Sequence, residues 1–509
     1  MFPARDDLFR VLPEIVLCIS GIVLMLVEPF LTRARRAVLV SLATLGASLA
    51  LLATVYPAMH EGPAFSGLLL VDGFSVFVHV AVGLVALLIV LGSADYLDRE
   101  RIQHGEYYAL ILFATAGMGV MASAGELVTS FVGLEMSSIS TYILASYRRD
   151  APRSNESAMK YFLLGSFATA FFLYGVAMVY GATGTTQLAR MTLRDLPQSG
   201  NLLKLGLALI LVGLGFKVAA APFQLWTPDV YEGAPSPVTA LMASGPKIAA
   251  FALLVRILAM VPTAGSFWFW ALWISAVTTM FVGNLAALPQ TNVKRLLAYS
   301  SVAHAGYVLV AVTAVAASDQ IDLAVAAVLY YLLTYALVKL GAFVLIAQLG
   351  GTAERHLEID DLAGLGSRQP VAAACFTLFL LSLLGLPATA GFLGKLYIFN
   401  AALSAHLVWL AVLLGINSVI ASFYYLNVIV TMYMREPHQD WPPARVPWAT
   451  ALVLLVAAAG TIYLGLFPAR VMGFASQAAL SLPNSRAEVP SATIPAGPES
   501  AETKGPQER

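Results

Sequence analysis

Long apolar segments recur along almost the whole chain. A helix needs about 20 mostly apolar residues to cross the hydrocarbon core of a bilayer. About fourteen segments meet that requirement. The segments are residues 11–32, 37–56, 73–94, 107–123, 126–147, 158–180, 202–221, 237–258, 267–288, 297–316, 322–349, 370–403, 406–433 and 447–467. This pattern predicts an all-α polytopic membrane protein with about fourteen transmembrane helices in contact with the lipid bilayer.

The composition excludes soluble and nucleic-acid-binding proteins. Apolar residues make up 59% of the chain and charged residues 11%, whereas soluble domains average about 45–50% and about 25%. The formal net charge is zero, so the chain has no electrostatic attraction to nucleic acid. Cys18 and Cys375 lie in separate apolar segments, which argues against a disulfide framework. The first apolar segment carries Glu14 and Glu28 and is too long for a cleaved signal, so we expect it to be the first span.

Two of the predicted spans contain residues that interrupt helices. The seventh includes Pro222 and leads into the Pro- and Gly-rich run 226–237, and the twelfth includes the run 385–391. Because the breaks lie five spans apart, we expect two inverted five-helix repeats, spans 4–8 and 9–13, with broken helices 7 and 12. The predicted units are three N-terminal helices (1–105), a first repeat (106–258), a second repeat (259–433), helix 14 (434–478) and a disordered tail (479–509).

Arginine and lysine are distributed unevenly between alternate loops. One of the two alternating sets of loops holds only Arg190, Arg194 and Lys204, and the other set is rich in arginine and lysine. The rich set consists of Arg33, Arg35, Arg36, Arg99, Arg101, Arg148, Arg149, Arg153, Lys294, Arg295, Arg355, Arg368, Arg435 and Arg445. The positive-inside rule therefore predicts that the rich set faces the cytoplasm and that both termini lie on the periplasmic side.

Ionisable residues are predicted inside several spans. They are Glu135, Lys217, Lys247, Lys339, Lys395 and His304. An isolated charge at the bilayer centre costs about 2.5–3.5 kcal/mol on insertion scales, so these side chains must face the bundle interior, pair with one another, or meet water. The deep cations are lysines, while most arginines lie in loops. A buried lysine can release its proton and an arginine cannot, so this asymmetry favours proton transfer.

Glu135 and Lys217 are the natural pair, because Lys217 lies beside the first break. Such a pair is either one step of a switchable proton path or a buried salt bridge that fixes helix register. Carbonyl groups freed by Pro246 could solvate Lys247. Lys395 follows the second break, and for both of these lysines the alternative is a side chain that snorkels to the interface.

Three further residues have open roles. Lys339 has no break nearby. His304 either relays protons near neutral pH or is a hydrogen-bonded packing residue. Lys160, at the start of the sixth span, is either a snorkelling anchor or a residue on the proton-uptake side, whereas His79 in the third span is interpreted as structural.

The sequence contains neither a nucleotide-binding loop nor a cluster of cysteine and histidine with metal-ligand spacing. We therefore expect this chain to carry no metal and no redox cofactor, and to hydrolyse nothing.

Four stretches resemble the antiporter-like subunits of respiratory complex I, the bacterial NADH:quinone oxidoreductase. They are FVGLEM at 131–136, GFKVAAAPFQLWTPDVYEGAPSPVTA at 215–240, KRLLAYSSVAHAGY at 294–307 and GLPATAGFLGK at 385–395. The run 226–237 is most similar to the subunit N branch of that family, the counterpart of mitochondrial subunit 2. The resemblance covers the chain up to about residue 478.

The resemblance implies a proton-translocating subunit of the bacterial inner membrane, with other membrane-arm subunits, including further antiporter-like subunits, as partners. FMN, iron–sulfur clusters and quinone are implied elsewhere in such a complex. Proton transfer is implied at matching positions of this sequence. These are the fifth-helix Glu135, the seventh-helix Lys217, the central Lys247, the twelfth-helix Lys395, and His304 and Lys339 on helices that line the family's hydrophilic axis.

Two other functions remain open. The first is a cation/proton antiporter subunit, although a sodium path requires several buried anionic oxygens and the deep sites here are mostly lysines. The second is a membrane-arm subunit that supports the assembly without pumping, against which the deep lysines also argue.

Overall fold

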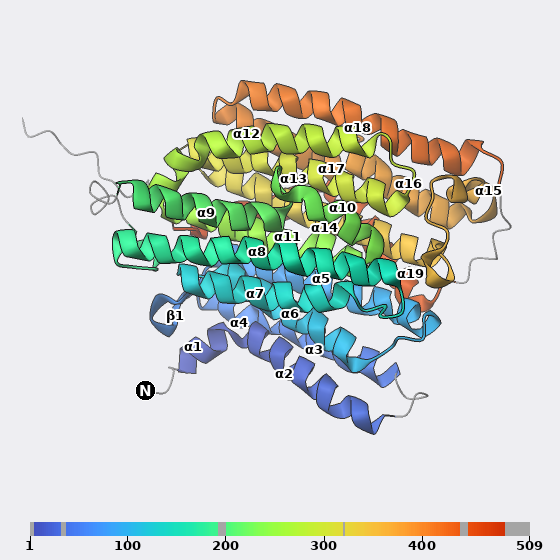
Figure 1. Ribbon diagram of the computed structural model, residues 1–509, viewed down its shortest axis with the longest axis horizontal. Helices are drawn as coiled ribbons and strands as arrows, with labels where there is room; N and C mark the ends of the chain where they lie inside the picture. Colours follow the sequence, from blue (N-terminus) through green and yellow to red (C-terminus); the bar gives the residue numbers. More distant parts are fainter. Residues whose placement is uncertain (1–4, 32–36, 192–199, 319–320, 438–445, 484–509) are drawn as a thin grey trace, which may run out of the picture.

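The computed structural model describes residues 5–31, 37–191, 200–318, 321–437 and 446–483, and these are almost entirely helical (Figure 1). One antiparallel two-stranded sheet, β1 (Gly62–Ala64) with β2 (Leu69–Val71), precedes the third span. The helices of the first half are α1 (Arg5–Arg10), α2 (Leu12–Val27), α3 (Ala37–Ala53), α4 (Val55–Met59), α5 (Gly73–Arg99), α6 (Gly105–Ser123), α7 (Leu127–Ala145), α8 (Pro152–Thr183), α9 (Gly200–Val218), α10 (Trp226–Gly233) and α11 (Ser236–Met260). Those of the second half are α12 (Pro262–Ala287), α13 (Val293–Ala317), α14 (Asp322–Leu349), α15 (Leu365–Arg368), α16 (Pro370–Leu384), α17 (Ala390–Ser404), α18 (Val408–Met434), α19 (Trp448–Leu466) and α20 (Ala469–Ser481).

The predicted all-α polytopic membrane fold is confirmed. Within the described ranges, 13 helices are long and apolar enough to cross a membrane, or up to 14 if the bent pair Asp360–Arg368 and Pro370–Leu384 counts as one span. The predicted twelfth span, 370–403, is the reason why the number of long apolar helices differs from the fourteen predicted. It consists of α16 and α17, each of 15 residues, and Gly385 and Ala388 between them have left-handed backbone angles.

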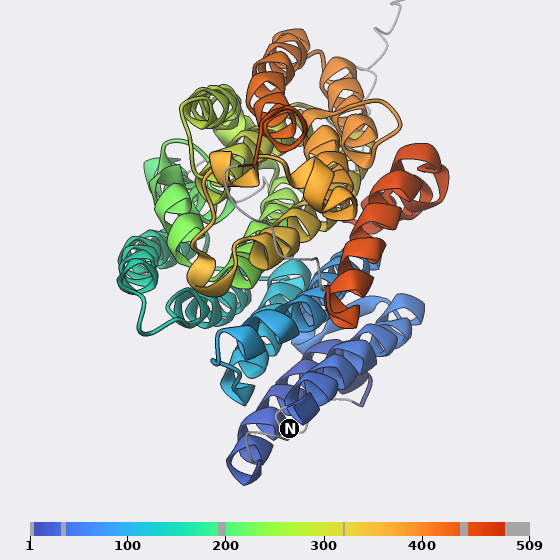
Figure 2. The same ribbon diagram turned by 90° about the vertical axis from the view of Figure 1, so that its right-hand side faces the viewer.

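The helices lie side by side, and three of them form the centre of the bundle (Figure 1). Every residue of α11 is buried, and α11 packs against α5, α6, α7, α9, α13 and α14. Most residues of α13 and α14 are buried as well. The first helices, α2 and α3, form one edge of the bundle, and the C-terminal α19 and α20 lie against α5 and α14 (Figure 2). Residues carried by α11, α13 and α14 are therefore the most deeply enclosed.

Both expected helix interruptions coincide with backbone groups that side chains satisfy. Between α9 and α10, Ala221 N–H donates to Thr279 Oγ1 (2.8 Å) and Ser275 Oγ donates to Ala221 O (2.9 Å). Next to the break between α16 and α17, Gly391 N–H in the first turn of α17 donates to Ser382 Oγ in the last turn of α16 (3.1 Å). Non-helical backbone at membrane depth requires such partners. The inverted-repeat relation of 106–258 to 259–433 stays a prediction.

The C-terminal helices extend past the predicted start of the disordered tail. Helix α20 continues to Ser481, whose Oγ accepts a hydrogen bond from Phe74 N–H (2.9 Å). The first residues of the predicted tail, 479–481, are therefore helical. Residues 484–509 lie outside the described part of the chain.

One buried ion pair joins a loop to the ends of two central helices. Lys294 Nζ, at the start of α13, lies 2.8 Å from Glu354 Oε2, and the two side chains are 0% and 5% exposed. Lys294 also donates to Ala234 O (2.6 Å), and Glu354 Oε1 accepts from Ser236 N–H (2.8 Å). Burial alone would raise the pKa of the Glu354 carboxyl, but Lys294 and the hydrogen bonds from Ser236 hold that pKa below its ordinary value.

We expect Glu354→Gln to destabilise the protein by about 3–5 kcal/mol, because it leaves the buried Lys294 charge without its partner. The measurement is the thermal unfolding midpoint in detergent, compared with Glu358→Gln at an exposed position. Because the pKa of Glu354 is lowered in the folded state, its contribution to the free energy of unfolding is fully present above the ordinary glutamate pKa of about 4.3. That contribution disappears as pH falls through the lowered pKa. Equal midpoints for the two variants would contradict this assignment.

Candidate functional site

Lys247 lies at the centre of the bundle and binds a backbone carbonyl. Its side chain is 2% exposed, and Nζ donates to Ser301 O on α13 (2.7 Å). The prediction that carbonyl groups freed by Pro246 solvate Lys247 is wrong in one respect. A proline at 246 leaves Met242 O without its helical donor, and Tyr231 OH, not Lys247, donates to that oxygen (3.2 Å). The amine of Lys247 therefore crosses to the neighbouring helix.

Lys339 on α14 lies near the same tyrosine ring as Lys247. Its Nζ donates to Leu297 O (2.8 Å) and to Ser300 Oγ (2.9 Å). The Tyr335 ring centroid lies 5.8 Å from Lys339 Nζ and 5.9 Å from Lys247 Nζ. A cation within about 6 Å of a ring centroid is attracted to its face. Tyr335 thus connects the two lysines.

His304 belongs to a continuous chain of hydrogen bonds that includes Lys339. Its Nδ1 lies 2.6 Å from Tyr331 OH, and its Nε2 lies 3.2 Å from Tyr425 OH. Tyr425 is hydrogen-bonded to Ser300, which accepts from Lys339. Three helices, α13, α14 and α18, contribute to this chain. His304 and Lys339, whose roles were open, are therefore parts of one network.

Lys395 lies beyond this network, next to the break between α16 and α17. Its Nζ donates to Leu384 O (2.8 Å), and it lies 4.8 Å from the centroid of the Tyr307 ring. Tyr307 OH accepts from Asn284 Nδ2 (3.1 Å), which also donates to Asn417 Oδ1 (3.0 Å). The carbonyl that the helix break exposes is thus used to hold the lysine.

Glu135 and Lys217 are close to the same part of α7 but do not form an ion pair. Lys217 Nζ donates to Ser138 Oγ (2.8 Å), one turn beyond Glu135 on α7. Glu135 Oε1 is buried and has no hydrogen-bond partner in the described part of the chain. Two rings, Tyr142 and Tyr161, each lie 5.8 Å from the lysine nitrogen. The expected direct contact is therefore replaced by a contact with a hydroxyl group.

Neutral acceptors hold all four deep lysines. Among the residues that the structure describes, no carboxylate forms an ion pair with Lys217, Lys247, Lys339 or Lys395. Across the described ranges, no group of three or more His, Cys, Asp and Glu residues could hold a metal ion. The site is therefore suited to exchanging protons between side chains, and it offers no carboxylate cage for a bound cation.

Lys160 lies in a charged hollow at one end of the bundle. It forms ion pairs with Asp229 (2.7 Å) and Glu156 (2.8 Å), and Asp229 also pairs with Arg295 (2.7 Å). These residues, with Glu232, line a hollow of about 190 Å³. Lys160 is therefore held by carboxylates, in contrast to the deep lysines.

Sequence reasoning did not single out the hydroxyl groups of the network. Their spacing nevertheless carries a signal. Tyr331, Tyr335 and Lys339 recur every four residues on α14, so they share one helix face. Ser300 and His304 have the same spacing on α13. Helical spacing therefore points from Lys339 to Tyr331 and Tyr335, and from His304 to Ser300, whereas no such spacing points to Tyr425 on α18.

Known proteins resemble this chain along almost its full length. Residues 124–421 match the family described as NADH:quinone oxidoreductase/Mrp antiporter, TM. NADH-quinone oxidoreductase subunit N 1 of Solibacter usitatus is 47% identical over 483 residues, which cover 94% of this chain and 98% of that protein. The resemblance inferred from four short motifs is thus confirmed over 94% of the chain.

Solved structures share the fold. A chain of the respiratory complex I from Thermus thermophilus with bound aureothin is 37% identical, with a TM-score of 0.77 over 91% of this chain and 99% of that one. A chain of the Mrp complex from a Dietzia species has a TM-score of 0.82 over 94% and 97%. Since it is 22% identical, it shows the likeness of fold alone.

We expect Ser138→Ala to bring Lys217 onto Glu135. The substitution removes the acceptor that holds the amine, and the carboxylate lies one helical turn away on the same face. A cryo-electron-microscopy structure of the variant would show Nζ within ion-pair distance of Glu135. Ser137→Ala is the matched control, because Ser137 Oγ has no hydrogen-bond partner among the described residues. A lysine that turns to any other acceptor would contradict the prediction.

Proposed function

We propose that this chain, which belongs to the subunit N family of NADH-quinone oxidoreductases, carries protons across the bilayer as an antiporter-like membrane subunit of that enzyme complex. The observation that carries the proposal is the row of Lys217, Lys247, Lys339 and Lys395, each buried and each held by carbonyl or hydroxyl oxygens. A lysine held by neutral acceptors has no fixed countercharge. The loss or gain of a proton at one lysine therefore changes the electrostatic energy of its neighbours.

The groups between the lysines suit proton transfer. Hydroxyl groups and imidazole can donate one hydrogen bond while accepting another. Ser300, Tyr425 and His304 supply such groups in the chain that includes Lys339, and the Tyr335 ring centroid lies 5.8 Å from Lys339 Nζ and 5.9 Å from Lys247 Nζ. Protons can therefore pass from side chain to side chain, with buried waters completing the path where direct contacts are missing.

Glu135 and Lys217 serve as the switch of this path. With the amine on Ser138, the Glu135 carboxylate is not neutralised by a direct contact. Movement of the amine to Glu135 would form an ion pair and change the charge that Lys247 experiences. Quinone reduction on other subunits, which bind FMN, iron–sulfur clusters and quinone, would drive this exchange through a coupling free energy along the row.

The charged hollow around Lys160 and Asp229 supports a direction for the transport. It lies near the ends of α8 and α13 whose loops are rich in arginine, which the positive-inside rule assigns to the cytoplasm. Protons are then taken up at this hollow, and both termini lie on the periplasmic side of the bacterial inner membrane. Other membrane-arm subunits, including further antiporter-like ones, are the partners that continue the row.

Cation/proton antiport and a purely structural role are less well supported. Sodium needs several oxygen ligands, and the carbonyl and hydroxyl oxygens named above already bind lysine amines, whose positive charges would repel the ion. A structural subunit has no need of buried lysines, each of which is costly in a membrane.

We expect Lys247→Ala to reduce NADH-driven proton uptake by about tenfold, because it removes the central proton-carrying amine. The measurement is made in inverted membrane vesicles with NADH oxidation followed in parallel, and native gels report assembly of the complex. Lys204→Ala, at an exposed lysine, is the control. An assembled Lys247→Ala complex that pumps normally would favour the structural role.

Tyr425→Phe tests the hydrogen-bonded chain by removing a single oxygen. The variant separates Ser300 from His304 and leaves the ring packing in place. We expect proton uptake to fall several-fold with normal assembly, and Tyr433→Phe, at a tyrosine that is 49% exposed, to pump normally. Equal uptake by the two variants would exclude Tyr425 from the path.

A further inference from the structure

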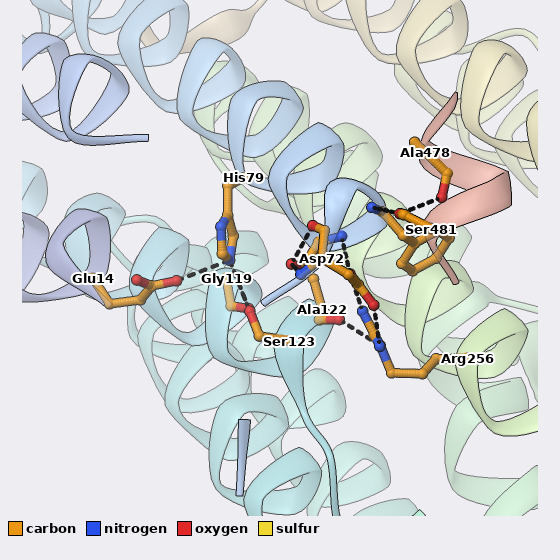
Figure 3. A network of polar contacts seen from close by, with 11 residues as sticks. Glu14, Asp72, His79, Gly119, Ala122, Ser123, Arg256, Ala478 and Ser481 are labelled. Atoms are coloured by element: carbon orange, nitrogen blue, oxygen red, sulfur yellow. Dashed lines mark hydrogen bonds and ion pairs between the residues drawn. The ribbon is translucent and has the colours of Figure 1, made fainter. Parts of the chain in front are cut away.

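A second buried cluster of ionisable groups lies away from the lysine row, among α2, α5 and α6 (Figure 3). His79 Nε2 lies 2.9 Å from Glu14 Oε1, 3.1 Å from Gly119 O and 3.0 Å from Ser123 Oγ. Glu14 is 8% exposed and His79 is 5% exposed. All three elements therefore meet at one imidazole nitrogen.

Two polar atoms of this cluster are left over. Glu14 Oε2 and His79 Nδ1 are buried and have no hydrogen-bond partner among the described residues. Both side chains line a small cavity of about 10 Å³, together with Thr54 and Thr115. A cavity of about that size admits one water molecule, provided that polar partners surround it. The unpartnered atoms supply donors and acceptors for such a molecule.

Asp72 and Arg256, the charged residues next to the pair in Figure 3, compensate each other, and the Glu61 carboxyl lies on the far side of Asp72, at Gly73. Arg256 on α11 binds both oxygens of Asp72 (2.8 Å each) and donates to Ala122 O (2.9 Å) (Figure 3). This bidentate ion pair is neutral as a unit. Asp72 and Arg256 face the pair from α5 and α11, and Cys18 lies one turn along α2 from Glu14. Ser123 and Ala122 are consecutive on α6, which joins the pair to the helix that carries Lys247.

The cluster is close to one end of the bundle. By the rise of 1.5 Å per residue, Glu14 lies about 3 Å and His79 about 9 Å from the starts of their helices. These starts are at the end opposite Arg99, which is the periplasmic end in the proposed orientation. A short path therefore separates the pair from the outer water.

We propose that Glu14 and His79 form a second proton-binding site, on the outer side of the bundle, that takes up and releases one proton during turnover. In the loaded state the pair holds one proton between Nε2 and Oε1 and has no net charge. On release the proton passes to a water molecule in the cavity, and the pair keeps a carboxylate and a neutral imidazole, with a net charge of −1. The inference rests on the proposed function, and it replaces the structural role expected for His79.

The test uses Glu14→Gln in the assembled complex. The glutamine oxygen still accepts from His79, so the helix contacts remain while the shared proton is lost. We expect the ratio of protons taken up to NADH oxidised in inverted vesicles to fall about twofold. In pH-difference infrared spectra of the purified complex between about pH 5 and pH 8, one carboxyl band should be missing. Thr44→Val on α3, at a residue that does not line the cavity and whose Oγ1 has no hydrogen-bond partner among the described residues, should change neither measurement.

A double variant separates proton binding from packing. Glu14→Leu with His79→Phe replaces both polar partners by apolar groups, which restores stability where a pair serves only as a helix contact. Normal proton uptake by the assembled double variant would overturn the proposal, as would an unchanged infrared spectrum for Glu14→Gln. Should Glu14→Gln not assemble, Glu14→Asp carries the same test, because the carboxyl band should shift in frequency, and an unshifted band would overturn the proposal.

Lys247→Ala in parallel distinguishes the two proposals. Loss of uptake in Lys247→Ala with a normal ratio in Glu14→Gln would overturn the second site and leave the proposed function in place. Normal uptake in Lys247→Ala with the loss in Glu14→Gln would support the second site and refute the lysine path.

Discussion

The bilayer interior offers no hydrogen-bond partners, and every polar group of this bundle is arranged under that constraint. Backbone N–H and C=O groups within a helix hydrogen-bond to one another, so most side chains of the spans can be apolar. Where the helices break, Thr279, Ser275 and Ser382 bind the freed backbone groups. The same constraint places Lys247 and Lys339 between α11, α13 and α14, because only the interior of the bundle supplies oxygens to hold them.

The structure contains two kinds of buried cation. Arg256 and Lys294 are held by carboxylates, Asp72 and Glu354, and these pairs fasten helix ends to neighbouring elements. The four deep lysines are held by carbonyl and hydroxyl oxygens instead. A charge with a bound countercharge costs more to neutralise than one held by neutral dipoles. Cations at helix ends are thus held by countercharges, and those in the middle of the bundle by neutral dipoles.

The fold could be predicted from the sequence because length and apolarity decide which segments span a bilayer. The limits of that reasoning are clear at 370–403, where an apolar stretch long enough for one span contains two short helices. The charged site residues were also predictable, since each stands out against an apolar background. Their partners were not. The position of Lys217 beside the first helix break suggested that it would bind Glu135. Ser138, one turn from Glu135 on α7, instead provides an acceptor without the cost of an ion pair.

Hydroxyl groups explain most of what sequence reasoning missed. A serine or tyrosine costs little inside a span, so it does not stand out as a lysine does. Its partner comes from a helix far away in the sequence, as with Ser300 and Tyr425, which are 125 residues apart. Yet hydroxyl and imidazole groups are the ones that donate and accept at the same time. The residues that are least visible in the sequence are therefore those that a proton path requires between its charged groups.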